Sequence, residues 1–266
     1  MMEGPPQSVS VEPQFFIPRP RPEARSRLFC FPHAGGSPIF FFDWAERLGP
    51  KIECVCVQYP GRGSRLREKP LFSVHDLVEE IGKGFPAIVE KPFTLYGHSF
   101  GGIVAFELIR KLRSLGYPLP NQLFVGATRP PHLESPFSPI HRLPDDKFVE
   151  AIQTRYGGIP PAIYRSPELL EIFLPAMRAD FTAYETYCFQ PDEPLNLPIS
   201  AFAGANDTAV ATASVREWSL HTRAGFDINV YPGGHFFPAT SGSDLVCALQ
   251  AYIDALQNGQ NSTLAN

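Results

Sequence analysis

The stretch FTLYGHSFGGIVAFELIRKL, residues 93–112, decides the fold. An apolar run is followed at once by a helical pattern, and Ser99 stands at the junction between Gly97 and Gly101. G-x-S-x-G between a strand and a helix is typical of a nucleophile elbow, a sharp turn that presents a serine hydroxyl above a sheet. Side chains at both glycine positions would collide with the neighbouring strand and helix. The sequence therefore predicts that Ser99 is a nucleophile.

The apolar runs around this junction predict a mostly parallel sheet. Short runs that are apolar on both faces read as strands: RLFCF, IECVCV, FTLYG, NQLFVGAT, PISAFAG and FDINVYP. Helical patterns alternate with the first of them: IFFFDWAERL, SVHDLVEEIGKGFPAIV and IVAFELIRKL. Such strands alternating with helices indicate a parallel sheet that helices cover on both faces. The expected fold class is therefore α/β.

Three segments depart from this alternation. Residues 1–25 carry six prolines and little apolar periodicity, which predicts a mobile, partly polyproline tail. Residues about 135–194 hold two amphipathic helical patterns with no strand between them, which is more than a connection between strands requires. We expect a helical lid over the carboxyl edge of the sheet, where ligands bind in these folds. The lid would interrupt one domain, residues 26–256, which a polar tail at 257–266 follows.

Composition limits the class of protein. The chain has 266 residues, 44% hydrophobic and 19% charged, which is typical of a soluble α/β domain with a sizeable core. A net charge of −4 gives no basic field of the kind that gathers nucleic acid. The N-terminus does not read as a signal peptide, and no apolar run reaches the length of a membrane helix. We expect a cytoplasmic monomer with neither nucleic-acid nor membrane partners.

Neither a metal nor a cofactor is indicated by the motifs. The five cysteines lie mostly in apolar runs and include no C-x-x-C pair, which predicts buried thiols in a reducing compartment. The sequence contains no H-E-x-x-H motif and no closely spaced group of histidines and cysteines. Gly61-Arg62-Gly63 does not fit a dinucleotide or phosphate fingerprint. We therefore expect chemistry that depends on side chains alone.

Candidate partners for Ser99 follow from the order of residues along the chain. A serine hydroxyl needs a base, and in a fold with such an elbow the partners follow in the order serine, acid, histidine. Among seven histidines, His235 alone follows the last predicted strand, in NVYPGGHFF. Asp207 follows PISAFAG directly, at the carboxyl end of a strand, where it can hold the second ring nitrogen of the histidine. The alternative for Asp207 is an ordinary turn aspartate.

An acyl enzyme also needs donors for the developing oxyanion. One is expected to be the backbone N–H of Phe100, directly after the nucleophile. The other should come from the loop after the first predicted strand, FPHAGG, and we choose the N–H of Ala34. Two glycines in such a loop allow close backbone approach to a ligand, although they are also common without function.

Taken together, these motifs resemble a known family. The segments CFPHAGG, YPGRGSR, GHSFGG, RADF, AGANDTAV and PGGHFF, between about Leu28 and Ile253, look like a stand-alone type II thioesterase of the α/β-hydrolase superfamily. The resemblance implies a triad of Ser99, Asp207 and His235. It also implies the oxyanion donors already chosen. The proline-rich N-terminus departs from the compact family pattern.

The resemblance implies a substrate and a role. Such proteins serve polyketide and nonribosomal peptide assembly lines, where they remove stalled or wrongly primed acyl groups. The implied substrate is an acyl chain on the phosphopantetheine arm of an acyl or peptidyl carrier protein, which would bind transiently. The arm belongs to the substrate, so no cofactor is implied.

Other functions are compatible with many of the same motifs. The chain-terminating thioesterase of fatty acid synthesis shares most of them. A serine esterase or acyltransferase also uses G-H-S-x-G, and a silent binding protein could keep the scaffold without the chemistry. Because carriers are often acidic, the basic residues Arg62, Arg65, Arg67 and Lys69 give a docking hypothesis.

Overall fold

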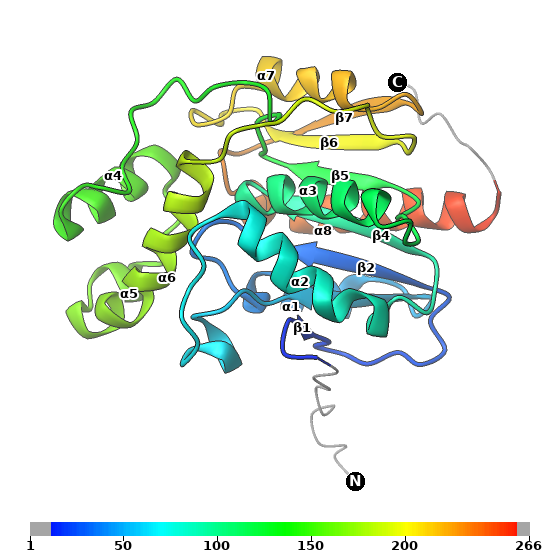
Figure 1. Cartoon of the computed structure of the whole chain (residues 1–266), viewed down its shortest axis with the longest axis horizontal. Coiled ribbons are helices and arrows are strands. Elements are labelled where there is room, and N and C mark those ends of the chain that lie inside the picture. Colours follow the sequence, from blue (N-terminus) through cyan, green and yellow to red (C-terminus); the bar gives the residue numbers. More distant parts are fainter. Residues whose placement is uncertain (1–11, 260–266) are drawn as a thin grey trace, which may run out of the picture.

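The computed structural model describes residues 12–259, which fold around one seven-stranded sheet (Figure 1). The strands lie in the order β1-β3-β2-β4-β5-β6-β7, and all neighbours are parallel except β1 and β3. The strand bounds are Phe15–Phe16 (β1), Ser26–Phe31 (β2), Ile52–Val57 (β3), Phe93–His98 (β4), Leu123–Gly126 (β5), Ile199–Gly204 (β6) and Phe226–Tyr231 (β7). This mostly parallel sheet confirms the predicted α/β class.

Helices cover both faces of the sheet (Figure 1). The first face carries α2 (Val74–Ile88), α3 (Phe100–Ser114) and α7 (Thr212–Arg216), and the second carries α1 (Phe42–Arg47) and α8 (Pro238–Gln257). Short 3₁₀ turns lie at Pro38–Phe41, Gly63–Arg65 and Glu217–His221. Successive strand side chains point to opposite faces, so Phe29 joins the core under α2 and α3 while Cys30 joins the other core. The inner strands contribute side chains to both cores, which explains why most of their residues are apolar.

Residues 12–25 belong to the folded body, which corrects the prediction of a mobile tail over residues 1–25. Phe15 and Phe16 form β1 along the outer side of β3. Phe15 is 1% exposed, and its ring meets the ring of Phe29 edge-on at 5.8 Å. Proline-rich composition concealed a segment whose few apolar side chains complete a core that is built elsewhere in the chain. Residues 1–11, and residues 260–266 of the predicted C-terminal tail, lie outside the described part.

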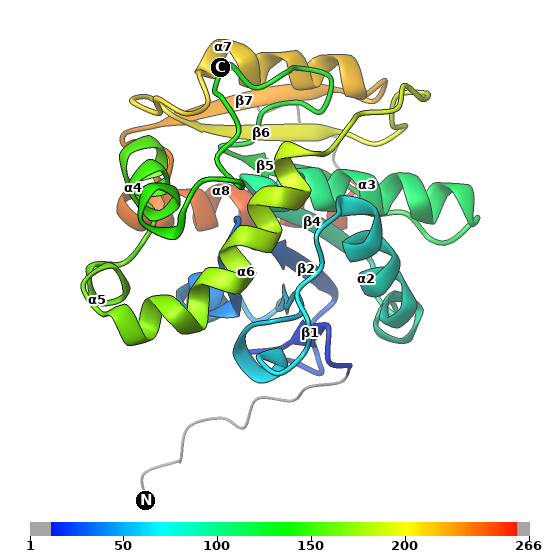
Figure 2. The same cartoon turned by 60° about the vertical axis from the view of Figure 1, so that its left-hand side comes forward.

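The long interval between β5 and β6 holds helices, as predicted, and the part of it from residue 135 to residue 194 contains no strand. There are three helices where the sequence showed two patterns: α4 (Asp145–Tyr156), the short α5 (Pro161–Tyr164) and α6 (Pro167–Glu185). Ser166 caps α6 by accepting a hydrogen bond from the N–H of Leu169. These helices project from one side of the sheet (Figures 1 and 2). They share a small apolar core, which includes Phe148 and Phe181, and we call residues 135–185 the helical insertion.

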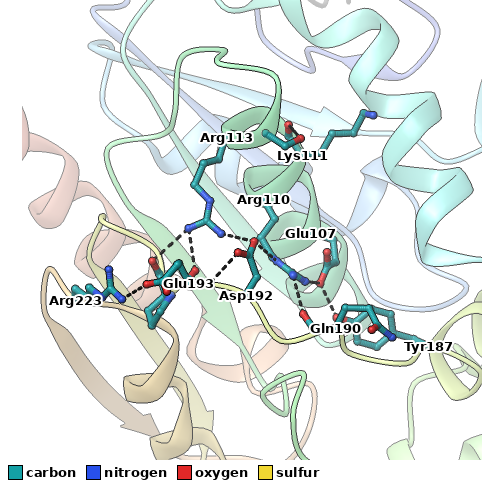
Figure 3. Close-up of polar contacts among 11 residues, drawn as sticks. Glu107, Arg110, Lys111, Arg113, Tyr187, Gln190, Asp192, Glu193 and Arg223 are labelled. Carbon is teal, nitrogen blue, oxygen red and sulfur yellow. Dashed lines mark hydrogen bonds and ion pairs between the residues drawn. The ribbon is translucent and has the colours of Figure 1, made fainter.

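Polar contacts fasten the segment after α6 to α3 (Figure 3). Arg110 pairs with Glu107 of its own helix at 2.6 Å and donates to the carbonyl oxygen of Gln190 at 2.7 Å. Farther along α3, Arg113 pairs with Asp192 at 2.6 Å. Because α3 begins at the residue after Ser99, the chain that leaves the insertion is tied to the helix that the predicted nucleophile precedes.

The cysteines divide into two groups. Cys30, Cys54 and Cys56 are buried in the sheet, whereas Cys188 and Cys247 are exposed. The prediction of buried thiols therefore holds for the strand cysteines and is wrong for the other two. Among the helices of residues 12–259, none is long and apolar enough to cross a membrane.

Candidate active site

Ser99 lies in a backbone conformation that its neighbours enforce. Its φ of 54° and ψ of −120° place it in the positive-φ region, which costs free energy for any residue with a side chain. The Ser99 N–H donates to the carbonyl oxygen of Gly126 at 2.7 Å, which ties the turn to β5. A Cβ atom at Gly97 would lie 2.3 Å from the carbonyl oxygen of Gly101, and one at Gly101 would lie 2.2 Å from that of Phe31. Both glycines are therefore required by close backbone packing, as predicted.

Ser99, His235 and Asp207 meet at the carboxyl edge of the sheet. The His235 Nε2 lies 2.9 Å from the Ser99 Oγ, and the His235 Nδ1 lies 2.9 Å from the Asp207 Oδ2. A carboxylate only accepts, so Nδ1 carries the proton and Nε2 is free to accept from the serine hydroxyl. The other carboxylate oxygen, Oδ1, accepts from the N–H groups of Ala209 and Val210 at 2.8 and 3.0 Å. The structure thus brings together all three residues of the predicted triad.

The loops that carry the acid and the base lock against each other. They follow β6 and β7, which are parallel neighbours, so both loops leave the same edge of the sheet. The Asn206 N–H donates to the carbonyl oxygen of Gly233 at 2.8 Å. A Cβ atom at Gly204 would lie 2.2 Å from the carbonyl oxygen of Gly234. The separation of Asp207 and His235 is therefore fixed by backbone contacts as well as by their own hydrogen bond.

His98 lies beneath the elbow and contacts the backbone of the histidine that serves as the candidate base. It is fully buried, and its Nε2 lies 3.1 Å from the backbone carbonyl oxygen of His235. A carbonyl can only accept, so Nε2 is protonated, and Nδ1 accepts from the Tyr96 hydroxyl at 3.2 Å. Burial, followed by the nearby His235, lowers the pKa of His98 well below its usual range. His98 thus remains neutral beside the triad.

The proposed oxyanion donors lie in two segments that touch at the elbow. Residues His33 to Gly36 form a tight turn, which closes with the Gly36 N–H donating to the His33 carbonyl oxygen at 2.8 Å. Gly35 has a φ of +75°, which suits the third position of a type II turn. Within residues 12–259, the N–H groups of Ala34 and Phe100 donate to no protein acceptor. Both are therefore free to donate to a substrate oxygen.

The side chain of His33 lies in an aromatic cage next to that turn. Its ring meets the rings of Phe40 and Phe236 edge-on at 4.9 and 4.8 Å. Burial, together with the nearby His235 and Arg62, lowers the pKa of His33 to about 3. The imidazole is therefore neutral at ordinary pH, and it adds no positive charge to the site.

The helical insertion lies against the triad. The ring of Tyr156, the last residue of α4, is 5.0 Å from the ring of His235. The ring of Tyr184, on α6, meets the ring of Phe100 at 6.0 Å. Sequence analysis gave neither tyrosine a role, because a tyrosine inside an amphipathic helical pattern reads as a core residue. A cavity of about 560 Å³ lies along α4 and reaches Thr208, the neighbour of Asp207.

The basic loop that sequence analysis offered as a docking surface does not present its cationic side chains as expected. Arg62 and Arg65 are only 3% and 4% exposed. Arg62 pairs with Asp180 of α6, and Arg65 pairs with two glutamates. Only Arg67 and Lys69 remain exposed. The docking hypothesis is therefore wrong for the two arginines that the fold uses internally. The signal for Arg62 was present in the RADF motif, which supplies its partner.

Comparison with known proteins gives one consistent result. The thioesterase domain family matches residues 26–250. The chain is 39% identical over 232 residues to the thioesterase PikA5 of Streptomyces venezuelae. The aligned region covers 86% of this chain and 82% of that protein. It is 36% identical over 214 residues to the gramicidin S biosynthesis protein GrsT of Aneurinibacillus migulanus, covering 80% and 83% of the two chains. Among solved structures, the type II thioesterase BorB from the borrelidin biosynthetic cluster superposes with a TM-score of 0.83 at 34% identity, covering 91% of this chain and 98% of BorB.

Proposed function

The chain belongs to the thioesterase domain family as a serine thioesterase of the α/β-hydrolase fold, and we propose that it hydrolyses acyl groups from the phosphopantetheine arms of carrier proteins. The observation that carries this proposal is the position of His235, within 2.9 Å of both Ser99 and Asp207. The relatives from gramicidin S biosynthesis and from the borrelidin biosynthetic cluster support a role on polyketide or nonribosomal peptide carriers. There it would remove stalled or wrongly primed acyl chains.

In the proposed acylation step, Ser99 attacks the thioester carbonyl carbon. His235 takes the hydroxyl proton on Nε2, and Asp207 stabilises the imidazolium ion that forms. The N–H groups of Ala34 and Phe100 donate to the oxygen of the tetrahedral intermediate. When the intermediate collapses, the C–S bond breaks and the thiol leaves. A thiol of cysteine type has a pKa near 8.5, so the sulfur can leave as thiolate with little help. It then takes the proton from the His235 imidazolium, which leaves His235 neutral for the next step.

In the proposed deacylation step, water replaces the thiol. His235 takes a proton from the water, and the resulting hydroxide attacks the acyl-serine carbonyl. The second tetrahedral intermediate returns the proton through His235 to the Ser99 oxygen, and the free acid is released. These steps use side chains, backbone N–H groups and water.

We propose that the helical insertion acts as a lid over this site. Tyr156 and Tyr184 bring α4 and α6 against the triad and the oxyanion segment, so the insertion controls which chains reach Ser99. A carrier-bound arm must pass the lid before acylation, and water must pass it afterwards. The domain, which includes residues 12–25 in addition to the expected residues 26–256, and a transient complex with the carrier are parts of the same proposal.

The test replaces Ser99 and follows release of acyl groups by intact mass. Ser99→Ala should lose at least about 10³-fold in turnover on acyl-loaded carriers, because no other group can form the acyl-enzyme. Its unfolding midpoint should match that of the unaltered protein. Ser114→Ala, at the other end of α3, is the matched control and should keep full activity.

The substrate class needs its own comparison. The same acyl group should be hydrolysed faster as a carrier-bound thioester than as an oxoester or as a free small-molecule thioester. Substantial activity in Ser99→Ala, or an oxoester preference, would contradict the proposed function.

A further inference from the structure

A buried ion pair grips the turn that bears Ala34. The Asp180 Oδ2 accepts from the Gly35 N–H at 2.7 Å and from the Arg62 Nη1 at 2.5 Å. The second carboxylate oxygen accepts from the Arg62 Nη2 at 2.8 Å. Arg62 in turn donates to the carbonyl oxygen of Gly36 at 3.1 Å. The Asp180 carboxylate and the Arg62 guanidinium group thus hold an N–H and a C=O of the same turn.

Further contacts fix this turn from two more sides. The Tyr59 hydroxyl donates to the carbonyl oxygen of Pro32 at 3.3 Å, and the Arg62 guanidinium lies 5.1 Å from the centre of the Tyr59 ring. Met177, one turn before Asp180 on α6, covers Gly35 so closely that a Cβ atom there would lie 2.5 Å from its Cγ. The segment before Ala34 is therefore held by the loop after β3, and the segment after it is held by α6.

Stability alone does not explain the choice of these residues. The Arg62 and Asp180 side chains are 3% and 0% exposed, so both charges have lost their water. Removing charges from water costs about as much as their mutual attraction returns, and a well-packed apolar pair often gives equal or greater stability. What an apolar pair cannot do is accept a hydrogen bond from Gly35 or donate one to Gly36. The distinctive property of the ion pair is that it forms hydrogen bonds with the backbone of both Gly35 and Gly36.

We propose that Asp180, held by Arg62, is a positioning residue that aims the Ala34 N–H at the substrate oxyanion. The inference rests on the proposed function, because it assumes that Ala34 is an oxyanion donor. An N–H one residue away from a clamped peptide cannot rotate freely, so its direction is set before the substrate arrives. Preorganised donors of this kind stabilise the transition state more than they stabilise the bound substrate.

The same contact links the oxyanion turn to the lid. Asp180 lies on α6, which belongs to the helical insertion, whereas Arg62 and Gly35 belong to loops of the sheet domain. Moving α6 away would remove both Asp180 and Met177 from the turn. The oxyanion turn is therefore fully supported only while α6 lies in the position described here.

The experiment compares a single variant with a charge-free double variant. Asp180→Asn should lower kcat about 10- to 100-fold on an acyl thioester of N-acetylcysteamine, which is less than the loss of a whole oxyanion donor. KM should change less than about threefold, because the donor matters most in the transition state. Butylboronic acid forms a tetrahedral adduct with an active serine, so its inhibition constant should rise by a factor similar to the fall in kcat.

The double variant Arg62→Met with Asp180→Leu separates positioning from stability. It should unfold within a few degrees of the unaltered protein, yet kcat should remain at least about tenfold low, because the Gly35 N–H still lacks its acceptor. Asp145→Asn is the matched control. It removes a carboxylate that also pairs with an arginine of α6, Arg178, but its side chain is exposed. Its kcat should be unchanged.

Each outcome decides the matter. Recovery of kcat in the double variant would show that the pair serves stability only, and a double variant that does not fold would also overturn the inference. Equal losses in Asp145→Asn would point to a general effect of charge on α6. If the unaltered protein neither hydrolyses the thioester nor is inhibited by the boronic acid, the proposed function itself fails, whatever the variants do.

Discussion

The sheet domain and the helical insertion are held together by different kinds of contact. The sheet domain buries two large apolar cores, and short backbone hydrogen bonds lock the loops that carry Ser99, Asp207 and His235. The insertion has a small apolar core of its own, and the buried Arg62–Asp180 pair is among its links to the sheet domain. Regions with few buried apolar contacts open at lower free energy. The geometry of the triad therefore comes from the sheet domain, whereas control of access is the role that we propose for the insertion.

The largest expected effect comes from a substitution in the sheet domain, at the turn that holds Ser99. Gly101→Ala would place a Cβ atom 2.2 Å from the Phe31 carbonyl oxygen and 2.6 Å from that of Pro32. Because both obstacles are backbone, we expect a loss of about 3 kcal/mol or more in the free energy of unfolding, together with near-complete loss of activity. Urea unfolding and thioester hydrolysis measure the two effects.

The control for that substitution is Gly242→Ala in α8. A Cβ atom there meets nothing within 4 Å, so the variant should be neutral or slightly more stable. If Gly101→Ala behaved like Gly242→Ala, the elbow would be more pliant than its contacts indicate.

A smaller and more local effect is expected from the core of the insertion. Phe148 is fully buried there and packs against Phe181 at 5.5 Å. Phe148→Ala should destabilise α4 to α6 by about 3 kcal/mol, since it leaves a cavity in a small core. Amide hydrogen exchange should increase in residues 135–185 much more than in the strands. Uniform acceleration across the strands would show that the two regions unfold as one unit.

The smallest expected effect is a loss of stability of the sheet domain at low pH, caused by His33. The pKa of His33 is lowered to about 3, whereas an unfolded histidine titrates near 6.5, so the unfolded chain binds the proton first as the pH falls. The contribution of neutral His33 to the free energy of unfolding is therefore fully present above about pH 6.5 and is lost progressively below it. Since His33 keeps some exposure, the loss between pH 7.5 and pH 5 should reach up to about 2 kcal/mol. Urea unfolding at both values should show a shallower dependence on pH in His33→Gln.

Much of the sheet and the triad could be predicted because their signals are local. Apolar runs gave the strands from β2 to β7, and the residues at their carboxyl ends gave Ser99, Asp207 and His235 as candidates that the structure brings within hydrogen-bonding distance. A parallel sheet collects those ends at one edge whatever the details of its packing. The fold class followed from the same pattern.

The features that could not be predicted depend on partners far away in the sequence. Arg62 read as part of a basic surface because its neighbours are charged, whereas its partner Asp180 lies 118 positions later. Phe15 read as part of a tail because prolines surround it, and its burial depends on Phe29 and Phe85. In each case the local composition was compatible with an exposed side chain, and the residue is buried because of a contact with a distant part of the sequence.

The strand β1 has a practical meaning for anyone who shortens this chain. The matched family region begins at residue 26, yet Phe15 and Phe16 pair with β3, and the Arg21 N–H donates to the side chain of Glu53 in that strand. Without residues 12–25, the apolar run IECVCV would become a bare border of the sheet, open to pairing with another molecule. Trimming to the family boundary would therefore invite self-association, and a chain that begins before residue 12 is the safer choice for crystallisation or enzymology.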